Sequence, residues 1–470
     1  MTGRFTAASP SASEPYSPQL RTALVLTGTG TAGAYHAGAL RALAEAGVKI
    51  DLVAGRGMGA IGALFHAVDG GSRLWEEDGF WRSPAAAGLY QWRWIPKAMA
   101  WALAIAAVIV VAPILAVALG LIVFPIDFLL KVVGIGGASG LVGWYTSAAD
   151  AAFAPAMLPT WLPRLVLLVL GGAVAIALAD GWRQHARAPR GPFWWRMVRP
   201  IISADQAFEH TWRVLWDLLR GAAALKQPTA AELARRYVEL AADNLGQPGF
   251  RELLITVHDM DAHRDLMFAL VAEHRRRDLV RRPRTDAADA RRAEVFDLAG
   301  PDRALLADAV AASLAIPLAT EPHTITFPAE SYWRGETHRL CDRPASLIRL
   351  MDELIDLGVK QIVLVASSED SGGPHALAPP RLDGFGRLGE YIASSEAAVV
   401  HDATTTTGGV RIYTIRPVHN PIGPFDFAGG FDDRSHRTQP LSELMGRGYE
   451  DAYHQFIEPV VGGSGEKMAL

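Results

Sequence analysis

A turn framed by glycines at residues 55–59 (GRGMG) is the segment that most resembles a catalytic motif. An apolar run, 50–54, precedes it and an apolar helical pattern, 60–68, follows it. Such a strand-turn-helix elbow holds the nucleophile of acyl hydrolases, close to backbone N–H groups that receive the oxyanion. Here Gly57 occupies the central position, between Gly55 and Gly59. Because glycine has neither hydroxyl nor thiol, acyl-enzyme chemistry is excluded at position 57.

A second glycine-rich segment, residues 27–33 (TGTGTAG), lies between an apolar strand pattern and a helical pattern. Gly28, Gly30 and Gly33 satisfy G-x-G-x-x-G, the fingerprint of dinucleotide-binding turns. The acidic residue expected at the end of the second strand is absent, but Arg56 stands there and could bind a 2′-phosphate. An NADP-binding protein therefore remains an alternative.

The elements that must position these two loops alternate along the chain. Strand, loop, helix, strand, turn and helix follow one another over residues 22–68. This order is typical of the opening of a parallel sheet covered by helices. We therefore expect an α/β domain.

Four separated pieces of the sequence share a pattern with one family. Residues 27–40 (TGTGTAGAYHAGAL) resemble the oxyanion loop G-G-G-x-[RK]-G and its helix, and residues 55–61 resemble the G-x-S-x-G elbow. Residues 309–317 (AVAASLAIP) resemble A-x-x-A-S-x-A-x-P, and residues 340–344 (LCDRP) stand where D-G-[GA] belongs. In these ordered pieces the chain resembles the patatin-like phospholipases.

The resemblance implies a three-layer domain with a mainly parallel sheet and a serine-aspartate dyad that hydrolyses acyl esters of lipids. The chain departs from the family at each catalytic element: Gly57 replaces the serine, Thr29 and Ala32 alter the oxyanion loop, and Arg343-Pro344 follow the aspartate. Asp342 is the vestigial member of the dyad.

These departures favour a catalytically inactive protein. We expect a lipid-binding or scaffolding homologue with a pocket between the loop at Gly28, Gly57 and Asp342. The alternative from the enzyme class is an active lipid acyl hydrolase that uses another nucleophile, namely Thr27, Thr29, Thr31, Cys341 or a water activated by Asp342.

A long apolar segment separates the family-like halves. Residues 98–126 contain 29 consecutive uncharged residues, more than the roughly 20 that cross a bilayer. A shorter apolar run, 165–179, follows. Since both halves of one sheet must lie on the same side of a membrane, we expect two transmembrane helices, about 99–124 and 161–180, forming a hairpin. A hairpin buried in a large soluble core is the alternative.

Basic residues flank the two runs on their outer sides, so the positive-inside rule places both termini in the cytoplasm of a multi-pass protein of the inner cell membrane. The expected organisation is a disordered tail (1–20), the first half of the domain (21–75), the membrane insertion (76–200), the second half (201–370) and a loop-rich C-terminal region with a closing helix (371–470).

Composition limits the partners. A net charge of −4 gives no general attraction to nucleic acid. Histidines and aspartates at 258–263 sit in a turn, where aspartate commonly bonds backbone, so no metal is expected, and no cofactor is expected either. The expected partners are membrane lipid and a protein in the membrane.

Overall fold

The computed structural model describes residues 15–133, 139–154, 161–185, 200–281, 293–370, 381–406 and 409–462. The chain divides into two units, an α/β unit formed by Met1–Gln91 with Ile202–Leu470 and an inserted unit, Trp92–Ile201. Of the expected disordered tail 1–20, residues 1–14 lie outside the described residues. Tyr16, in the remainder, is buried against Phe456 and donates to the carbonyl of Lys49 at 2.9 Å.

A mainly parallel sheet forms the centre of the α/β unit, as the sequence predicts. Its strand order is β11-β10-β1-β2-β5-β6-β7, and β9 pairs with β5 and β8. The antiparallel pairs are β5 with β6, β5 with β9, and β8 with β9. The strands are β1 (Thr22–Gly28), β2 (Leu52–Gly57), β5 (Glu252–Asp259), β6 (Arg264–Leu270), β7 (Val295–Asp297), β8 (His323–Thr326), β9 (Thr337–Cys341), β10 (Gln361–Ala366) and β11 (Arg411–Ile415).

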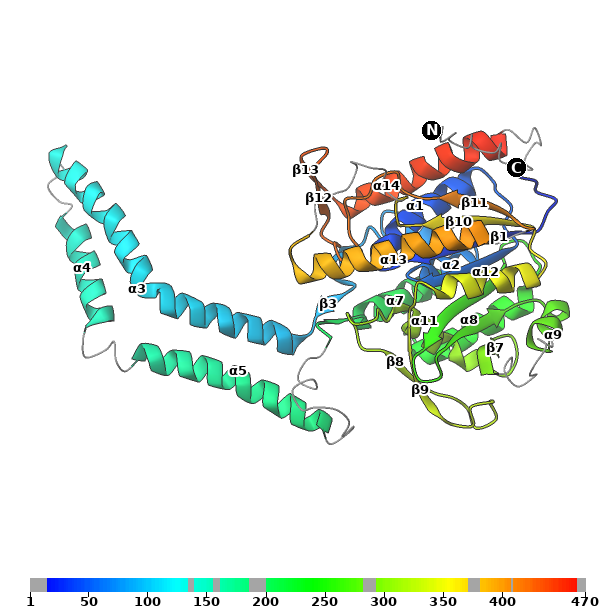
Figure 1. Cartoon of the computed structure of the whole chain (residues 1–470), viewed down its shortest axis with the longest axis horizontal. Coiled ribbons are helices and arrows are strands. Elements are labelled where there is room, and N and C mark those ends of the chain that lie inside the picture. The colour runs from blue at the N-terminus through cyan, green and yellow to red at the C-terminus, as the bar shows by residue number, and fades with distance from the viewer. Residues whose placement is uncertain are drawn as a thin grey trace, which may run out of the picture. The chain divides into compact units, whose positions relative to one another are not determined.

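Helices cover both faces of this sheet (Figure 1). Alternate side chains of a strand point to opposite faces, so Leu24 and Leu26 of β1 join one hydrophobic core and Ala23 and Val25 join the other. The first core includes residues of α1 (Ala32–Glu45), α2 (Gly59–His66), α7 (Asp205–Arg220), α8 (Ala230–Asn244), α11 (Leu306–Leu314) and α14 (Leu441–Ala452). The second includes residues of α9 (Glu273–Arg281), α12 (Ser346–Asp356) and α13 (Gly384–Thr406). The unit is therefore a three-layer α/β fold.

Short elements complete the unit. They are the 3₁₀ turns Gly71–Leu74, Pro84–Gly88 and Arg303–Leu305, the strands β3 (Gln91–Trp92), β4 (Ile202–Ser203), β12 (Gly430–Asp432) and β13 (Arg437–Gln439), and a π-helical segment, Tyr453–Val461, that continues α14. The closing helix packs closely on α1, since an added Cβ on Gly38 would lie 1.9 Å from the carbonyl oxygen of Met445.

The inserted unit consists of helices in the part of it that is described. They are α3 (Trp94–Val132), α4 (Ser139–Phe153) and α5 (Trp161–His185), and α3 packs against both others. The backbone N–H of Arg93 donates to the carbonyl of Ile201 at 2.9 Å, so the two ends of the unit lie side by side. Figure 1 draws α3 with a bend, and the helix contains Pro113 and Pro125, each of which removes a backbone donor.

The expected two-helix transmembrane hairpin is not confirmed. Among the described residues, α3 is the one helix long and apolar enough to cross a membrane, and the apolar part of α5, Pro163–Ala179, is shorter. Helix α4 was not predicted from the sequence, because it is neither long nor uniformly apolar. Large side chains of α3 such as Ile114, Val117 and Leu121 are 67–73% exposed, which does not favour the alternative of a hairpin buried in a soluble core.

Candidate functional site

The two glycine-containing turns lie next to each other at the carboxyl ends of the neighbouring central strands β1 and β2. Strands β1 and β2 run in parallel with Gly28 opposite Gly57. Parallel strands in register end together, so the loop after β1 and the elbow after β2 meet. Gly57 has a φ of +56°, a conformation that glycine adopts without strain.

Asp342 reaches the same point from a distant part of the chain. It follows β9, and its backbone N–H donates to the carbonyl of Ala315 at 2.8 Å, within the segment that resembles A-x-x-A-S-x-A-x-P. An ideal Cβ on Gly57 would lie 2.7 Å from Asp342 Oδ2 and 2.6 Å from the carbonyl oxygen of Gly28. The structure thus brings together the residues that the sequence singled out at three separate places, Gly28, Gly57 and Asp342.

The side chain of Arg56 lies among these residues. Its Nη1 donates to both carboxylate oxygens of Asp342, at 2.8 and 2.7 Å, and its Nε donates to Thr27 Oγ1 at 2.8 Å. Its Nη2 donates to Glu396 Oε1 at 2.7 Å. The relative exposures of Arg56, Asp342 and Glu396 are 1%, 1% and 4%. We call these three residues the buried ion network.

Charge compensation makes this network possible. Burial alone lowers the pKa of Arg56, but the carboxylates of Asp342 and Glu396 outweigh burial and raise it. The guanidinium therefore stays charged and holds both oxygens of Asp342. Both oxygens of Asp342 are thus engaged in hydrogen bonds with Arg56.

Glu396 of α13 was missed by the sequence interpretation. The signal that could have revealed it is Arg56 itself, an arginine at the end of an apolar strand, because a buried guanidinium requires carboxylate partners. That signal predicts the chemistry of the partners but not their positions, since Glu396 lies 340 residues further along the chain.

One backbone donor in each turn is bonded to a carbonyl of the protein itself. Met58, the residue after the nucleophile position, donates its N–H to the carbonyl of Gly28 at 2.9 Å. In hydrolases of the elbow type this N–H contributes to the oxyanion hole. Thr31 donates its N–H to the carbonyl of Pro424 at 3.1 Å and its hydroxyl to the carbonyl of Gly423 at 3.0 Å. Protein carbonyls thus occupy donors that could otherwise receive an oxyanion.

A loop of the C-terminal region, residues 420–427, covers the glycine-rich turn. An added Cβ on Gly30 would lie 1.9 Å from the carbonyl oxygen of Pro424, and one on Gly33 would lie 2.2 Å from the ring of Trp81. Gly55 and Gly59 show the same close approach, at 2.5 Å from the carbonyl oxygen of Gly59 and 2.1 Å from that of Leu26. These glycines therefore serve packing of the loops and helices against one another.

Packing of this kind argues against the NADP-binding alternative. A dinucleotide-binding turn uses its glycines so that the pyrophosphate can approach the backbone. Here the carbonyl of Pro424 makes that approach to Gly30, and Arg56 is engaged with two carboxylates rather than free for a 2′-phosphate.

The alternative nucleophiles Cys341 and Thr29 are both buried. Burial, followed by the charge of Asp342, raises the pKa of the Cys341 thiol to about 12, so it is protonated at neutral pH. Thr29 Oγ1 lies 2.7 Å from Glu396 Oε1 and 3.3 Å from Asp342 Oδ2, and Thr29 is 4% exposed. Its single proton can serve one carboxylate, and the shorter contact is to Glu396.

One buried histidine borders the network. His36 Nε2 lies 3.1 Å from the carbonyl oxygen of Thr27, while Nδ1 has no hydrogen-bond partner in the described part of the chain. Burial lowers the pKa of His36 to about 4, and the charge of Arg56 acts in the same direction. The imidazole is therefore neutral in the folded protein at pH 7.

The histidines and aspartates at 258–263 are engaged in structural contacts. Asp259 lies 2.5 Å from His338 and accepts N–H groups of its own turn, Asp261 pairs with Arg339, and His258 lies 2.8 Å from Asp265. Within the described ranges, no cluster of three or more histidine, cysteine, aspartate or glutamate residues could hold a metal ion.

Comparison with known proteins agrees with the positions of these turns. Residues 24–124 match the family model described as patatin-like phospholipase, a range that contains the glycine-rich loop and the elbow and extends into α3. No curated protein sequence matches the chain. The crystal structure of VipD from Legionella pneumophila is similar at 12% identity with a TM-score of 0.30, covering 95% of this chain and 67% of that one. At that score the likeness adds nothing to the argument. Over its glycine-rich loop and elbow, the chain is thus similar to the patatin-like phospholipases.

Proposed function

We propose that this chain is a membrane-anchored member of its family that no longer performs acyl transfer and acts by binding lipid or a protein partner at the membrane. The buried ion network carries this proposal. At the position of the family's serine there is Gly57, and beside it Arg56 binds both oxygens of the aspartate that would assist that serine. A site with no nucleophile at position 57, and with its aspartate bound by an arginine, has no route to an acyl-enzyme there.

The network also changes where lipid contact is expected. A lipid pocket was expected between Gly28, Gly57 and Asp342, but these residues pack directly against one another. Even a Cβ added to Gly57 would lie 2.7 Å from a carboxylate oxygen of Asp342. Lipid contact is better supplied by the inserted unit, whose α3 exposes a continuous apolar surface. The domain would then serve as a scaffold for a partner.

Fluorophosphonate labelling and hydrolysis of phospholipid vesicles and short-chain esters by the purified full chain test the inactive state. We expect neither labelling nor turnover above that of the Asp342→Ala variant. A Thr29→Val variant, which keeps the shape of the side chain and removes the hydroxyl, is the control for a relocated nucleophile. Turnover that is lost in either variant would replace this proposal with an active hydrolase.

Membrane anchoring has a separate test. We propose that α3 and the return through α5 place both parts of the α/β unit in the cytoplasm, at the inner membrane. Arg93 and Lys97 before the apolar stretch of α3 agree with a cytoplasmic start. The chain should resist extraction with alkaline carbonate, and protease added outside spheroplasts should leave the α/β unit intact. Extraction into the soluble fraction, or cleavage of the α/β unit from outside, would contradict the anchoring or the orientation.

A further inference from the structure

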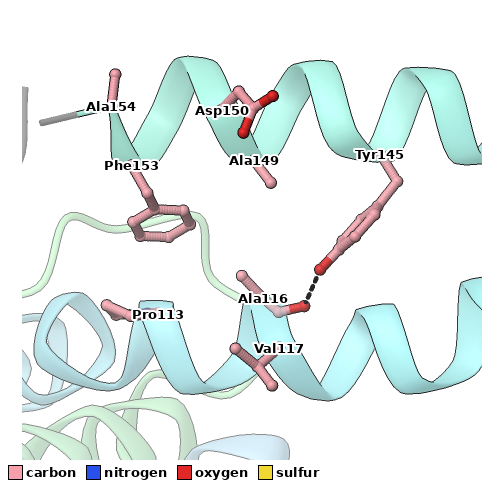
Figure 2. Close-up of a pocket in the computed structure, with 8 residues that line it drawn as sticks. All are labelled: Pro113, Ala116, Val117, Tyr145, Ala149, Asp150, Phe153 and Ala154. Atoms are coloured by element: carbon pink, nitrogen blue, oxygen red, sulfur yellow. Dashed lines mark hydrogen bonds between the residues drawn. The ribbon is translucent and has the colours of Figure 1, made fainter.

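A groove lies between α3 and α4 inside the inserted unit. Its volume is about 550 Å³, within the range of small-molecule sites. Figure 2 shows the side chains that line it from the two helices, among them Pro113 and Val117 of α3 and Tyr145, Ala149, Asp150 and Phe153 of α4. The lining is apolar except for the carboxylate of Asp150 and the phenol of Tyr145.

Close contacts fix α4 alongside the apolar part of α3. The hydroxyl of Tyr145 donates to the carbonyl of Ala116 at 2.7 Å. The ring of Tyr145 lies 5.8 Å from that of Phe124, and an added Cβ on Gly120 would lie 2.6 Å from the Tyr145 hydroxyl. Gly120 therefore makes room for the tyrosine, and α4 runs back beside the residues of α3 that precede its end.

This packing sets the depth of the groove in a bilayer. Pro113 lies near the centre of the uncharged stretch 98–126. At 1.5 Å per residue, about 20 Å of apolar helix extends from Pro113 in each direction. If α3 crosses a membrane, the groove lies near the middle of the hydrocarbon layer, and α4 re-enters that layer without crossing it.

Asp150 is then an ionisable group at a depth where charge is unfavourable. Such residues face protein interiors or cavities, have partners and mark binding sites or ion pathways. The other aspartate of these helices, Asp127, has its partner in Lys131 at 2.6 Å. Asp150 is exposed at the rim of the groove, and its carboxylate has no hydrogen bond or ion pair among the residues that the structure describes. A cationic ligand in the groove would therefore compensate the charge of the Asp150 carboxylate.

We propose that this groove binds a membrane-soluble amphiphile with an alkyl chain and an amine, the ammonium group facing Asp150 and the chain lying against Pro113, Val117 and Phe153. The opposite charge of the ligand removes the cost of the isolated carboxylate, and the alkyl chain matches the apolar lining. This inference rests on the proposed membrane anchoring. It assigns to the inserted unit a ligand site that is separate from the buried ion network.

The probe for this site is a long-chain alkylamine that carries a photoreactive diazirine, added to the full chain in phosphatidylcholine vesicles. Peptide mapping after irradiation locates the labelled residues, and unlabelled dodecylamine serves as competitor. We expect saturable labelling of α3 and α4 peptides. Labelling should fall about tenfold or more in Asp150→Asn, the range expected for loss of a charge-assisted hydrogen bond.

A matched pair of variants tests the groove itself. Ala149→Trp fills the groove, whereas Ala148→Trp adds the same ring at the neighbouring position of α4 that does not line it. We expect the first to abolish labelling and the second to retain it. Equal labelling of both variants, or of Asp150→Asn and the unsubstituted chain, would overturn the proposal. Equal labelling by the corresponding alkyl alcohol would also overturn it, because the carboxylate would then select nothing.

Carbonate extraction of the same vesicles separates the two proposals. Chain that stays in the membrane but shows no saturable labelling contradicts the amine site alone. Chain that is extracted contradicts the anchoring on which the site depends.

Discussion

Replacement of Arg56 by methionine is the sharpest test of the buried ion network. Methionine has a similar length and no charge, so Arg56→Met leaves the carboxylates of Asp342 and Glu396 facing each other without a cation. Both are almost fully buried, and the hydroxyl of Thr29 lies 2.7 Å from Glu396 and 3.3 Å from Asp342, with one proton to donate. The variant therefore removes the one group that compensates two buried charges.

The size of the effect follows from burial. Removal of one partner of a buried ion pair typically costs about 3–5 kcal/mol, because the remaining charge is left without compensation. We expect Arg56→Met to lower the free energy of unfolding by this amount. Arg41 provides a matched control: it pairs with Glu45 at 2.8 Å, but its side chain is 45% exposed. For Arg41→Met, the loss of an exposed i,i+4 pair predicts about 0.5 kcal/mol or less.

Urea titration of the detergent-solubilised chain, followed by tryptophan fluorescence, measures both variants. Trp212 and Trp81 lie in the core of the α/β unit, so their emission reports its unfolding. The triple variant Arg56→Met, Asp342→Asn, Glu396→Gln removes all three charges at once. Its stability should exceed that of Arg56→Met alone, since neutral amides are less costly to bury than unpaired carboxylates.

Two results would refute this reasoning. If Arg56→Met were no less stable than Arg41→Met, Arg56 would not stabilise the fold by compensating the charges of Asp342 and Glu396. If the triple variant were less stable than Arg56→Met, the hydrogen-bond geometry of the carboxylates rather than their charge would dominate.

Three further predictions concern single residues. Gly57→Ser should remain inert to fluorophosphonate and be destabilised by at least about 1–3 kcal/mol in urea titration, because position 57 has a φ of +56° and its new Cβ would meet Asp342; labelling would contradict this. Burial raises the pKa of the Cys341 thiol to about 12, from 9.0 for an ordinary thiol. Its reaction with iodoacetamide at pH 8, followed by mass spectrometry, should therefore be about a thousandfold slower in the folded chain than in urea, and equal rates would contradict its burial. As the pH is lowered from 6.5 towards 4, the free energy of unfolding should fall, because His36 takes up a proton in the unfolded chain at a higher pH than in the folded chain. This loss should reach about 3 kcal/mol, disappear in His36→Gln and remain in His454→Gln, the control for an exposed histidine.

The parallel α/β domain could be predicted from the sequence because its first elements are dictated locally. Apolar runs such as residues 22–26 alternate with helical patterns and glycine turns, and each signal lies within a few residues of the element it specifies. The meeting of Gly28 and Gly57 follows from parallel pairing alone. The expected nearness of Asp342 relied on the family pattern, because no local signal links residue 342 to residue 57.

The buried ion network and the packing of the inserted unit were harder to predict from the sequence, for different physical reasons. Arg56 was interpreted as a possible phosphate ligand because a sequence does not reveal whether a strand-end side chain turns inward. Glu396 depends on the docking of α13, which is a tertiary event. The expected disordered tail, residues 1–20, includes Tyr16, which is buried because it packs on Phe456, far along the chain. Helix α4 has mixed composition, and its packing on α3 depends on single residues such as Gly120.

The position of β1 in the sheet has a consequence for how the chain is made. Its neighbours are β2 and β10, and Thr22 pairs with Gln361, so β1 receives one of its partners more than three hundred residues after it is synthesised. The apolar α3 is synthesised in between. During translation, β1 therefore lacks its partner β10, and its unpaired edge favours aggregation or holding by a chaperone. Nascent chains arrested before residue 361 should remain protease-sensitive in β1, and chains extended beyond residue 415 should become resistant; early resistance of β1 would show that it finds another partner first.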